Sequence, residues 1–294
     1  MTSAIRPRRS VLYMPGSNAR ALEKARTLAA DCLILDLEDA VAPDAKEAAR
    51  EQVRAAVSAG GYGPRELIIR INGLTSPWGT EDLLAAIAAK PHAILLPKVS
   101  RAEDLTIVRQ ACSNADMADG IALWAMMETP LAMLNAGAIA AAAAAEVAPL
   151  TCFVMGTNDL AKETGASLDA GRMAMLPWLM TCVAAARAHA LAIVDGVYND
   201  FRDEDGFGSE CEQGRLLGMD GKTLIHPGQI DKANETFAPG ADEVSWAEKI
   251  IAAFDRPEHA GLGAINLEGR MVERLHADMA RRTLAMAAAI AARA

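Results

Sequence analysis

Eight short apolar runs, separated by longer helical segments, constrain the fold of this chain more than any other feature. Each run has six to eight residues and is apolar nearly throughout, which is typical of strands buried on both faces of a sheet. The runs are residues 10–15, 32–38, 66–72, 93–98, 121–128, 152–159, 192–197 and 222–227. Eight strand–helix units in series predict an α/β fold, a (β/α)8 TIM barrel.

The segments between these runs have helical patterns with capping signals. They are residues 17–30, 43–59, 80–89, 101–113, 130–145, 174–190, 210–217 and 227–237. A doubly wound sheet is the alternative architecture. It normally has a glycine-rich turn after its first strand, where this sequence has only Met-Pro-Gly-Ser-Asn at residues 14–18.

The chain continues beyond the expected barrel. Residues 242–260 predict a helix, residues 261–273 are punctuated by glycine, and residues 274–294 predict an Ala-rich amphipathic helix. The apolar face of that last helix is expected to contain Leu275, Met279 and Leu284. We therefore expect a catalytic barrel domain over residues 1–240 and a C-terminal helical lid and oligomerisation segment over residues 241–294.

Composition excludes several classes of protein. The net charge of -9 argues against nucleic acid as the main partner, because phosphate binding needs a basic face. No uninterrupted apolar run of about 18 residues occurs, and the arginines near the N-terminus are not followed by the apolar segment of a signal peptide. The five cysteines are odd in number and form no CxxC pair, so we expect neither disulfides nor a zinc site, and a reducing, cytoplasmic location.

Charged side chains gather where the apolar runs end. They are Asp36, Glu38, Asp39, Arg70, Lys98, Glu128, Asp159, Asp195 and, in the last run, His226. The active site of such a barrel lies at the C-terminal ends of its strands. This polarity predicts an enzyme with an anionic or metal-bound ligand.

Glu128 and Asp159 are the candidate metal ligands. Two carboxylates at neighbouring strand ends, completed by water and substrate oxygens, are the usual way in which proteins hold Mg²⁺. The alternative is a pair of ion-paired or helix-capping carboxylates.

Arg70 is the candidate clamp for a carboxylate or a developing oxyanion, because its planar fork binds such groups at two points. Alternatively, it neutralises Asp36 or Glu38 inside the barrel. Both roles are compatible if Glu38 orients Arg70.

Two weaker signals remain. Arg20 and Lys24 are spaced i, i+4 on the first helix, where they could bind phosphate or form a solvated face. His226 precedes Pro227 at a strand end, and we expect it to be a buried structural residue.

Eight motifs, in order along nearly the whole chain, resemble those of the citrate lyase β-subunit-like family of Mg²⁺-dependent aldolases and acyl-CoA lyases. They are RRSVLYMPGSNARALEKA, LILDLEDAV, IRING, LLPKV, METPLAMLN, MGTNDLA, DGVYNDFRD and GKTLIHPGQI. The resemblance implies a lyase of the malyl-CoA or citramalyl-CoA lyase type. It also implies a homotrimer or hexamer, with a C-terminal lid over a neighbouring subunit's active site.

The resemblance further implies roles for single residues. Glu128 and Asp159 would bind Mg²⁺, and Arg70 and Glu128 would lie at the substrate. Coenzyme A would bind near Arg20 and Lys24. The expected substrate-binding set also includes Glu38 and Asp39.

One position departs from the family pattern. Related lyases have an Asp in the C-terminal segment as the acid–base group, and this chain has Glu273 in the stretch GRMVERL. Glu has the same chemistry with one more methylene, and a misplacement of about 1 Å can cost two orders of magnitude in rate. We expect Glu273 to exchange a proton with the acyl carbon of a substrate bound by another subunit. The alternative is a Glu that caps the last helix.

The expected reaction is cleavage or condensation of a small β-hydroxyacyl-CoA thioester, with an acyl-CoA and an oxo acid as partners. The alternatives are a Mg²⁺-dependent aldolase on free hydroxy-oxo acids and a non-catalytic subunit that binds acyl-CoA or an acyl carrier. A thioesterase is also possible, if water attacks after cleavage.

Overall fold

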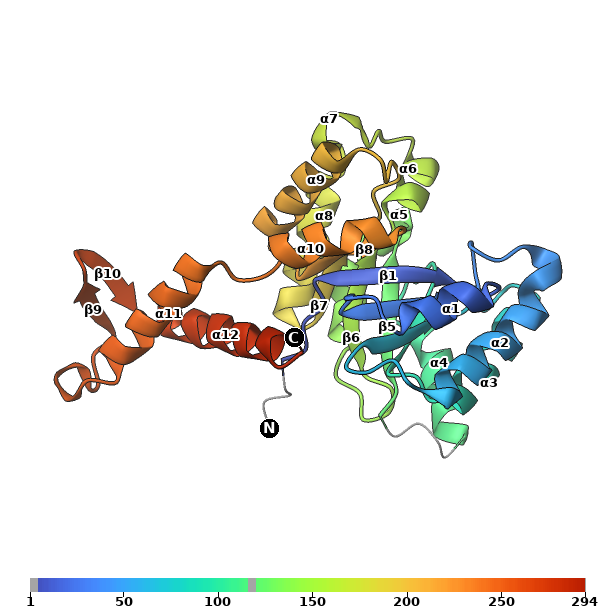
Figure 1. The fold of residues 1–294 in the computed structure, drawn as a ribbon, viewed down its shortest axis with the longest axis horizontal. Helices are drawn as coiled ribbons and strands as arrows, with labels where there is room; N and C mark the ends of the chain where they lie inside the picture. The colour runs from blue at the N-terminus through green and yellow to red at the C-terminus, as the bar shows by residue number, and fades with distance from the viewer. Residues whose placement is uncertain (1–4, 116–119, 294) are drawn as a thin grey trace. The chain divides into compact units, whose positions relative to one another are not determined.

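A computed structural model describes residues 5–115 and 120–293 of the chain. Within them, parallel strands pair in sequence order, and the last pairs with the first, so the sheet is a closed barrel (Figure 1). The strands are β1 (Ser10–Pro15), β2 (Cys32–Asp36), β3 (Glu66–Arg70), β4 (Ala93–Leu96), β5 (Ala122–Met127), β6 (Leu150–Met155), β7 (Ala192–Asp195) and β8 (Gly221–Leu224). The predicted (β/α)8 barrel is confirmed.

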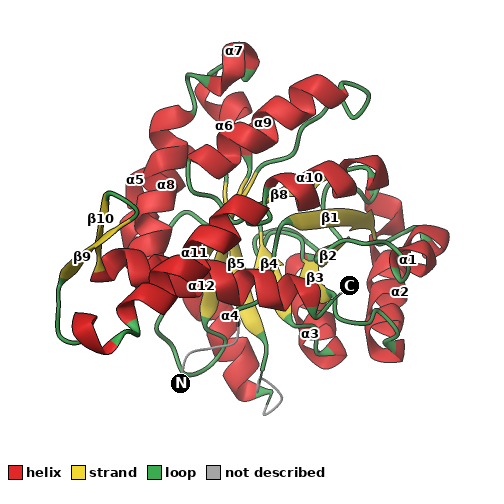
Figure 2. Cartoon of the chain, turned by 60° about the vertical axis from the view of Figure 1, so that its left-hand side comes forward, coloured by secondary structure: helices red, strands yellow, loops and turns green. Residues whose placement is uncertain are grey.

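Helices follow the strands and cover the outside of the barrel; Figure 2 shows strands in yellow and helices in red. They are α1 (Ala19–Ala25), α2 (Lys46–Ala59), α3 (Gly79–Ala89), α4 (Glu103–Asn114), α5 (Pro130–Ala141), α6 (Thr157–Thr164), α7 (Asp169–Arg172), α8 (Leu176–Ala188), α9 (Glu204–Leu216) and α10 (Ile230–Thr236). Short 3-10 helices precede α2 (Pro43–Ala45) and α10 (Pro227–Gln229).

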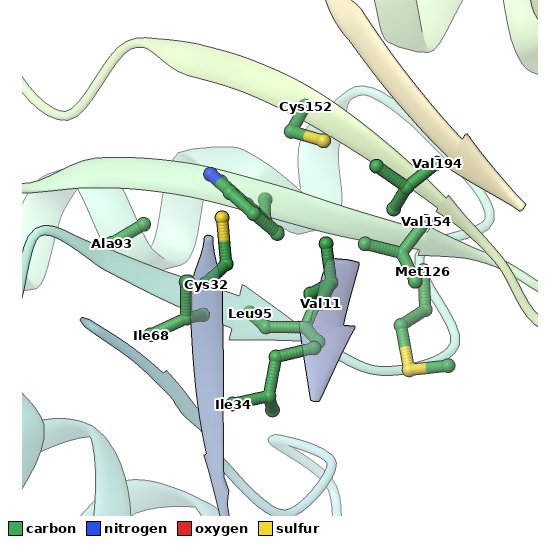
Figure 3. Packing of buried hydrophobic residues seen from close by; sticks show 11 residues of the cluster. Val11, Cys32, Ile34, Ile68, Ala93, Leu95, Met126, Cys152, Val154 and Val194 are labelled. Atoms are coloured by element: carbon green, nitrogen blue, oxygen red, sulfur yellow. The ribbon is translucent and has the colours of Figure 1, made fainter. Parts of the chain in front are cut away.

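Every second residue of the strands points into the barrel, where the side chains pack together (Figure 3). This core consists of Val11, Cys32, Ile34, Ile68, Ala93, Leu95, Trp124, Met126, Cys152, Val154 and Val194. Full burial of a large apolar side chain stabilises a fold by about 1.5–3 kcal/mol. The same alternation decides which strand-end residues face the interior.

An ion pair closes the N-terminal end of the barrel. Glu66, on the same face of β3 as Ile68, binds Arg8 at two points, with Nε–Oε2 at 2.8 Å and Nη2–Oε1 at 2.9 Å. The Arg8 guanidinium lies 4.8 Å from the centroid of the Trp124 ring. Charge is therefore not confined to the C-terminal ends of the strands, but here it is neutralised and packed.

The structure corrects several predicted elements. Residues 156–159 are not strand: β6 ends at Met155, and Asp159 lies in the first turn of α6, a helix that the pattern did not predict. Helix α9 begins at Glu204 rather than at residue 210, because the Asp203 side chain caps it by accepting from the Gly206 N–H. Helix α1 ends at Ala25, five residues before its predicted end.

Close contacts divide the chain into two compact units. One comprises Arg8–Thr236, and the other comprises, among the described residues, 237–293 together with 5–7. The expected domain boundary after residue 240 remains a prediction.

In the C-terminal unit, α11 (Ala241–Phe254) packs against α12 (Arg274–Ala291), and β9 (Ala264–Leu267) pairs with β10 (Arg270–Glu273). The hairpin turn is Glu268-Gly269, with φ of 50° and 81°, and two such residues form a type I′ turn. The predicted end of the last helix at residue 294 lies outside the described residues.

The predicted apolar face of α12 is wrong in part. Leu275 and Met279 are exposed, and the residues buried against α11 are Ala277 and Ala280, with Leu284 partly buried. The side of α12 that packs against α11 therefore carries small Ala side chains, and the larger Leu275 and Met279 lie outside this contact.

The five cysteines are free and buried. Among the described residues, no helix is both long enough and apolar enough to cross a membrane.

Candidate active site

Four side chains extend the interior faces of the strands at the C-terminal end of the barrel. Asp36 follows the register of Ile34, Arg70 that of Ile68, and Tyr13 that of Val11. Glu128 comes directly after β5 and continues the face of Trp124 and Met126. The predicted gathering of Asp36, Arg70 and Glu128 at this end follows from strand alternation.

Arg70 is buried and held on all sides. Its Nε and Nη2 atoms donate to Asp36 Oδ1 and Oδ2 at 2.6 and 2.7 Å. Nη1 lies 3.0 Å from Glu38 Oε2 and 3.2 Å from Asp39 Oδ2. The guanidinium also lies 4.8 Å from the centroid of the Tyr13 ring. The expected neutralisation of Asp36 and Glu38 is therefore present, and only the Nη1 edge faces a partner that is well exposed, Asp39.

One guanidinium thus faces three carboxyl groups. Burial raises the pKa of Glu38 to about 8, against the opposing effect of Arg70, and the nearby charges of Asp39 and Glu128 raise it further. Glu38 can therefore hold a proton near neutral pH, which makes it a proton-carrying group beside Arg70.

Glu128 is 1% exposed, and its Oε1 accepts a hydrogen bond of 2.7 Å from the backbone N–H of Lys98. Burial raises its pKa to about 7; the Lys98 N–H opposes this and the charge of Asp159 adds to it. Its Oε2 accepts no hydrogen bond from the residues that the structure describes.

Gly156, directly after β6, leaves the space that Glu128 occupies. A Cβ atom at this position would lie 2.5 Å from Glu128 Oε2 and would overlap Glu128 Cβ. Glycine is therefore required here by close approach and not by its own φ, which is -107°.

Asp159 reaches the site from the first turn of α6. Its Oδ1 lies 3.3 Å from Lys98 Nζ, and its side chain is one quarter exposed. Lys98 thus contacts both Glu128 and Asp159.

These residues fit Mg²⁺. The ion takes oxygen ligands and is commonly held by one or two carboxylates, the remaining positions going to water and substrate. Among the described residues, Glu128 Oε2 has no hydrogen-bond donor, and the Asp159 side chain is partly exposed, with the Lys98 ammonium 3.3 Å from its Oδ1. The described residues contain no group of three or more His, Cys, Asp or Glu that could hold a metal alone, so a site here would depend on water and substrate ligands.

Asp195 does not join this site. It follows Val194, which faces the interior, so its side chain points outward to the helices. There it forms a buried ion cluster with Arg172 (2.8 Å) and Lys222 (3.0 Å), and Glu210 contacts both cations. Although burial raises it, the pKa of Asp195 lies below its ordinary value because Lys222 and Arg172 are adjacent.

A cavity of about 540 Å³ lies on this outer side. Its lining includes Arg172 and Glu210 of the ion cluster, together with Thr157 and Tyr198. Arg70, Glu128 and Asp159 do not line it, so it is distinct from the candidate active site.

The other predicted site residues lie elsewhere. Arg20 and Lys24 are exposed on α1. Glu273 precedes α12 in the C-terminal unit, is half-buried, and donates its backbone N–H to His276 Nδ1. The expected burial of His226 is wrong: it is exposed, and it stacks on Phe201 at 4.8 Å between ring centroids.

Sequence reasoning missed the roles of Lys98 and Gly156. Lys98 was visible only as a charge after a strand, and its contacts depend on a turn with φ of 54°. Gly156 stands one residue beyond β6 and is the N-cap residue of α6, and that position was its only signal.

The chain belongs to the HpcH/HpaI aldolase/citrate lyase family, whose model matches residues 9–227. It is 53% identical to a protein of Cereibacter sphaeroides (strain KD131 / KCTC 12085) named (3S)-malyl-CoA thioesterase, over 99% of each chain. It is 33% identical to citrate lyase subunit beta of Escherichia coli (strain K12), over 96% of this chain and 94% of that one. The expected family is confirmed, and its lyase members support a carbon–carbon lyase.

A solved structure supports the fold and the cofactor. The protein CitE from Mycobacterium tuberculosis, in complex with magnesium, acetoacetate and coenzyme A, is 27% identical and has a TM-score of 0.75, covering 97% of this chain and 99% of that chain. The expected Mg²⁺ is therefore confirmed for structural neighbours in this family.

Proposed function

We propose that this protein uses Mg²⁺ to cleave a small β-hydroxyacyl-CoA thioester of the malyl-CoA type into an acyl-CoA and an oxo acid. The observation that carries the proposal is the placement of Arg70 at the same barrel end as Glu128 and Asp159. Glu128 and Asp159 would hold the metal. The name of the relative at 53% identity supports malyl-CoA as the type of substrate.

The chemical problem in this cleavage is charge. Breaking the carbon–carbon bond leaves an enolate on the acyl-CoA and a carbonyl on the departing oxo acid. Mg²⁺, when bound, supplies a Lewis acid that lowers the pKa of the substrate hydroxyl.

The residues of the chain supply the remaining functions. Arg70 would bind the carboxylate of the oxo-acid half through Nη1, in place of its present partners Glu38 and Asp39. Asp36 holds the guanidinium plane in place for this role. Glu38, with its raised pKa, can take up or release a proton beside Arg70.

Hydrolysis of the thioester is the second candidate. It is favoured by one observation, the thioesterase name of the relative that matches this chain over 99% of both lengths. The same groups would bind the substrate, and water would release coenzyme A.

Three finer proposals accompany the function. We propose that coenzyme A binds near Arg20 and Lys24, exposed cations of α1. We propose a homotrimer or hexamer in which Glu273 exchanges a proton with the acyl carbon of a substrate bound by another subunit. We also propose a reducing, cytoplasmic location, in keeping with the free buried cysteines.

The test is a product assay with Mg²⁺ and a panel of malyl-, citramalyl- and hydroxymethylglutaryl-CoA. Acyl-CoA with free oxo acid indicates the lyase, whereas free coenzyme A with intact hydroxy acid indicates the thioesterase. Free hydroxy-oxo acids in the same panel test the aldolase alternative. Glu128→Ala and Asp159→Ala should each abolish metal binding and activity, whereas Glu212→Ala, at an exposed position on helix α9, should change neither. Full activity in excess chelator would refute the proposal.

A further inference from the structure

Lys98 joins both proposed metal ligands, through a hydrogen bond to Glu128 and an ion pair with Asp159. Its backbone N–H donates to Glu128 Oε1 at 2.7 Å, and its ammonium lies 3.3 Å from Asp159 Oδ1. Neither the family match nor the relatives' names assign it a role.

The backbone conformation of Lys98 makes these contacts possible. Its φ is 54°, in the left-handed region that a residue with a long side chain rarely adopts. Continued strand alternation from Ala93 and Leu95 would turn Lys98 away from the barrel interior. The turn instead directs its N–H to Glu128.

A second set of hydrogen bonds holds this turn against the segment of Glu128. The Ser100 hydroxyl donates to the Lys98 carbonyl at 3.2 Å and pairs with the Thr129 hydroxyl at 2.8 Å. Thr129 is the neighbour of Glu128, and Asn135 donates to the Ser100 carbonyl at 2.9 Å. The backbone of Lys98 is therefore fixed relative to Glu128.

The side chain of Lys98 is held much more weakly. It is 49% exposed and joined to Asp159 by one contact of 3.3 Å. Exposed ion pairs of this kind contribute little to stability, so the ammonium can leave Asp159 at small cost. The ammonium and a divalent cation compete for the same carboxylate, and they repel each other when both are near it.

We propose that Lys98 is a positioning residue and built-in counter-ion of the metal site. Its N–H fixes Glu128 with or without metal, and its ammonium neutralises Asp159 until Mg²⁺ displaces it. The positive charge of Lys98 therefore weakens Mg²⁺ binding and protects the metal-free site from carboxylate repulsion. This inference rests on the proposed function, which places Mg²⁺ on Glu128 and Asp159.

The test is Mg²⁺ titration calorimetry on the full chain, with Mn²⁺ binding followed by electron paramagnetic resonance as a second readout. Lys98→Met should bind Mg²⁺ about tenfold more tightly than wild type, the order expected for removing one nearby charge. Lys98→Asn should do the same, and Asn tolerates the left-handed backbone. Lys162→Met is the matched control, because it removes an equal charge from exposed α6 surface, and its affinity should stay within about twofold.

Thermal unfolding supplies an independent readout. In chelator, Lys98→Met and Lys162→Met should unfold at similar temperatures, because the exposed Lys98–Asp159 pair contributes little to stability. At the same Mg²⁺ concentration, Lys98→Met should show the larger rise in unfolding temperature, because it binds the metal more tightly. Unchanged or weaker Mg²⁺ binding in both Lys98 variants, with wild type binding normally, overturns the inference and leaves the proposed function standing. Absence of Mg²⁺ binding in wild type overturns both.

Discussion

Asp36 and Arg70 form a two-point ion pair across adjacent strands, with Nε–Oδ1 at 2.6 Å and Nη2–Oδ2 at 2.7 Å. The strand register places them side by side, since Asp36 pairs with Arg70 in the β2–β3 ladder. This contact fixes the plane of the guanidinium, and the remaining nitrogen, Nη1, faces Glu38 and Asp39. A point charge could not be held in the same way.

Arg70→Lys should therefore keep the positive charge and lose the planar group that binds at two points. We expect turnover to fall by about 10²–10³, by analogy with the loss of an oxyanion donor. Arg187→Lys is the matched control, because Arg187 pairs with Asp220, directly before β8 at the N-terminal end of the strands, and its turnover should be near that of wild type. Unchanged steady-state kinetics for Arg70→Lys would assign Arg70 a purely structural role.

Gly156→Ala should disturb the proposed metal site through Glu128. The added Cβ overlaps the Glu128 side chain, so we expect Mg²⁺ affinity to fall at least about tenfold and stability to fall by about 1–3 kcal/mol. Calorimetry and urea unfolding measure the two effects. Gly137→Ala, where a Cβ meets nothing within 4 Å on helix α5, should be neutral or stabilising. Equal behaviour of the two variants would contradict the close approach.

Proton competition should make Mg²⁺ binding depend on pH. Burial raises the pKa of Glu128 to about 7, so below that pH a proton must leave before the carboxylate binds metal. Apparent Mg²⁺ affinity should fall by up to about tenfold per pH unit below 7, with proton release on binding. Calorimetry between about pH 5.5 and 8 measures the affinity and the proton release. A Mg²⁺ affinity that does not change with pH would contradict the raised pKa of Glu128.

The raised pKa of Glu128 also predicts how the stability of the fold changes with pH. Because the folded-state pKa of Glu128 is raised, the metal-free protein is stabilised at low pH. That stabilisation is lost as pH rises from the ordinary Glu value to about 7, and Glu38 extends the loss to about pH 8. Thermal unfolding in chelator should show this decline, and Glu128→Gln should make it shallower.

Asp195→Asn should destabilise the fold without disturbing the candidate active site. It removes the carboxylate that balances buried Arg172 and Lys222, and breaking a buried ion pair costs about 3–5 kcal/mol. The exposed pair Lys232–Glu212 is the control, and Lys232→Met should cost less than about 1 kcal/mol. A loss below about 1 kcal/mol for Asp195→Asn in urea unfolding would contradict this reading of the cluster.

Glu273 is tested by mixing two inactive variants. If Glu273 acts on a substrate in another subunit, Glu273→Gln and Glu128→Ala should regain part of the activity when their subunits exchange. Some interfaces then pair an intact barrel with an intact C-terminal segment. Full activity of Glu273→Gln alone would contradict the proposed proton transfer, and Glu273 would then be only the N-cap residue of α12.

Much of the fold was predictable because burial on both faces leaves a local signal. The apolar runs marked all eight strands, and the first run matches β1 residue for residue. Asp36, Arg70 and Glu128 were also predictable as a group, because strand ends in a closed parallel barrel meet at one rim. The roles assigned to Arg20, Lys24 and Glu273 stay predictions.

Other features had no local signal. Asp195 ends β7 as Asp36 ends β2, yet it faces outward into an ion cluster, since the tertiary fold decides which of the two alternating faces of a strand lines the barrel. The apolar face expected on α12 was replaced by Ala277 and Ala280, because the partner helix selects which side is buried.

The sequence by itself determined the order of strands and helices and the kinds of charge that end the strands, because hydrophobic periodicity and residue type are local properties. Only the tertiary structure decided which charges meet. Lys98 bridges Glu128 and Asp159 through a left-handed turn, and Gly156 makes room for Glu128, because both contacts join segments about 30 or more residues apart. Such contacts depend on the closure of the barrel, and no local pattern encodes them.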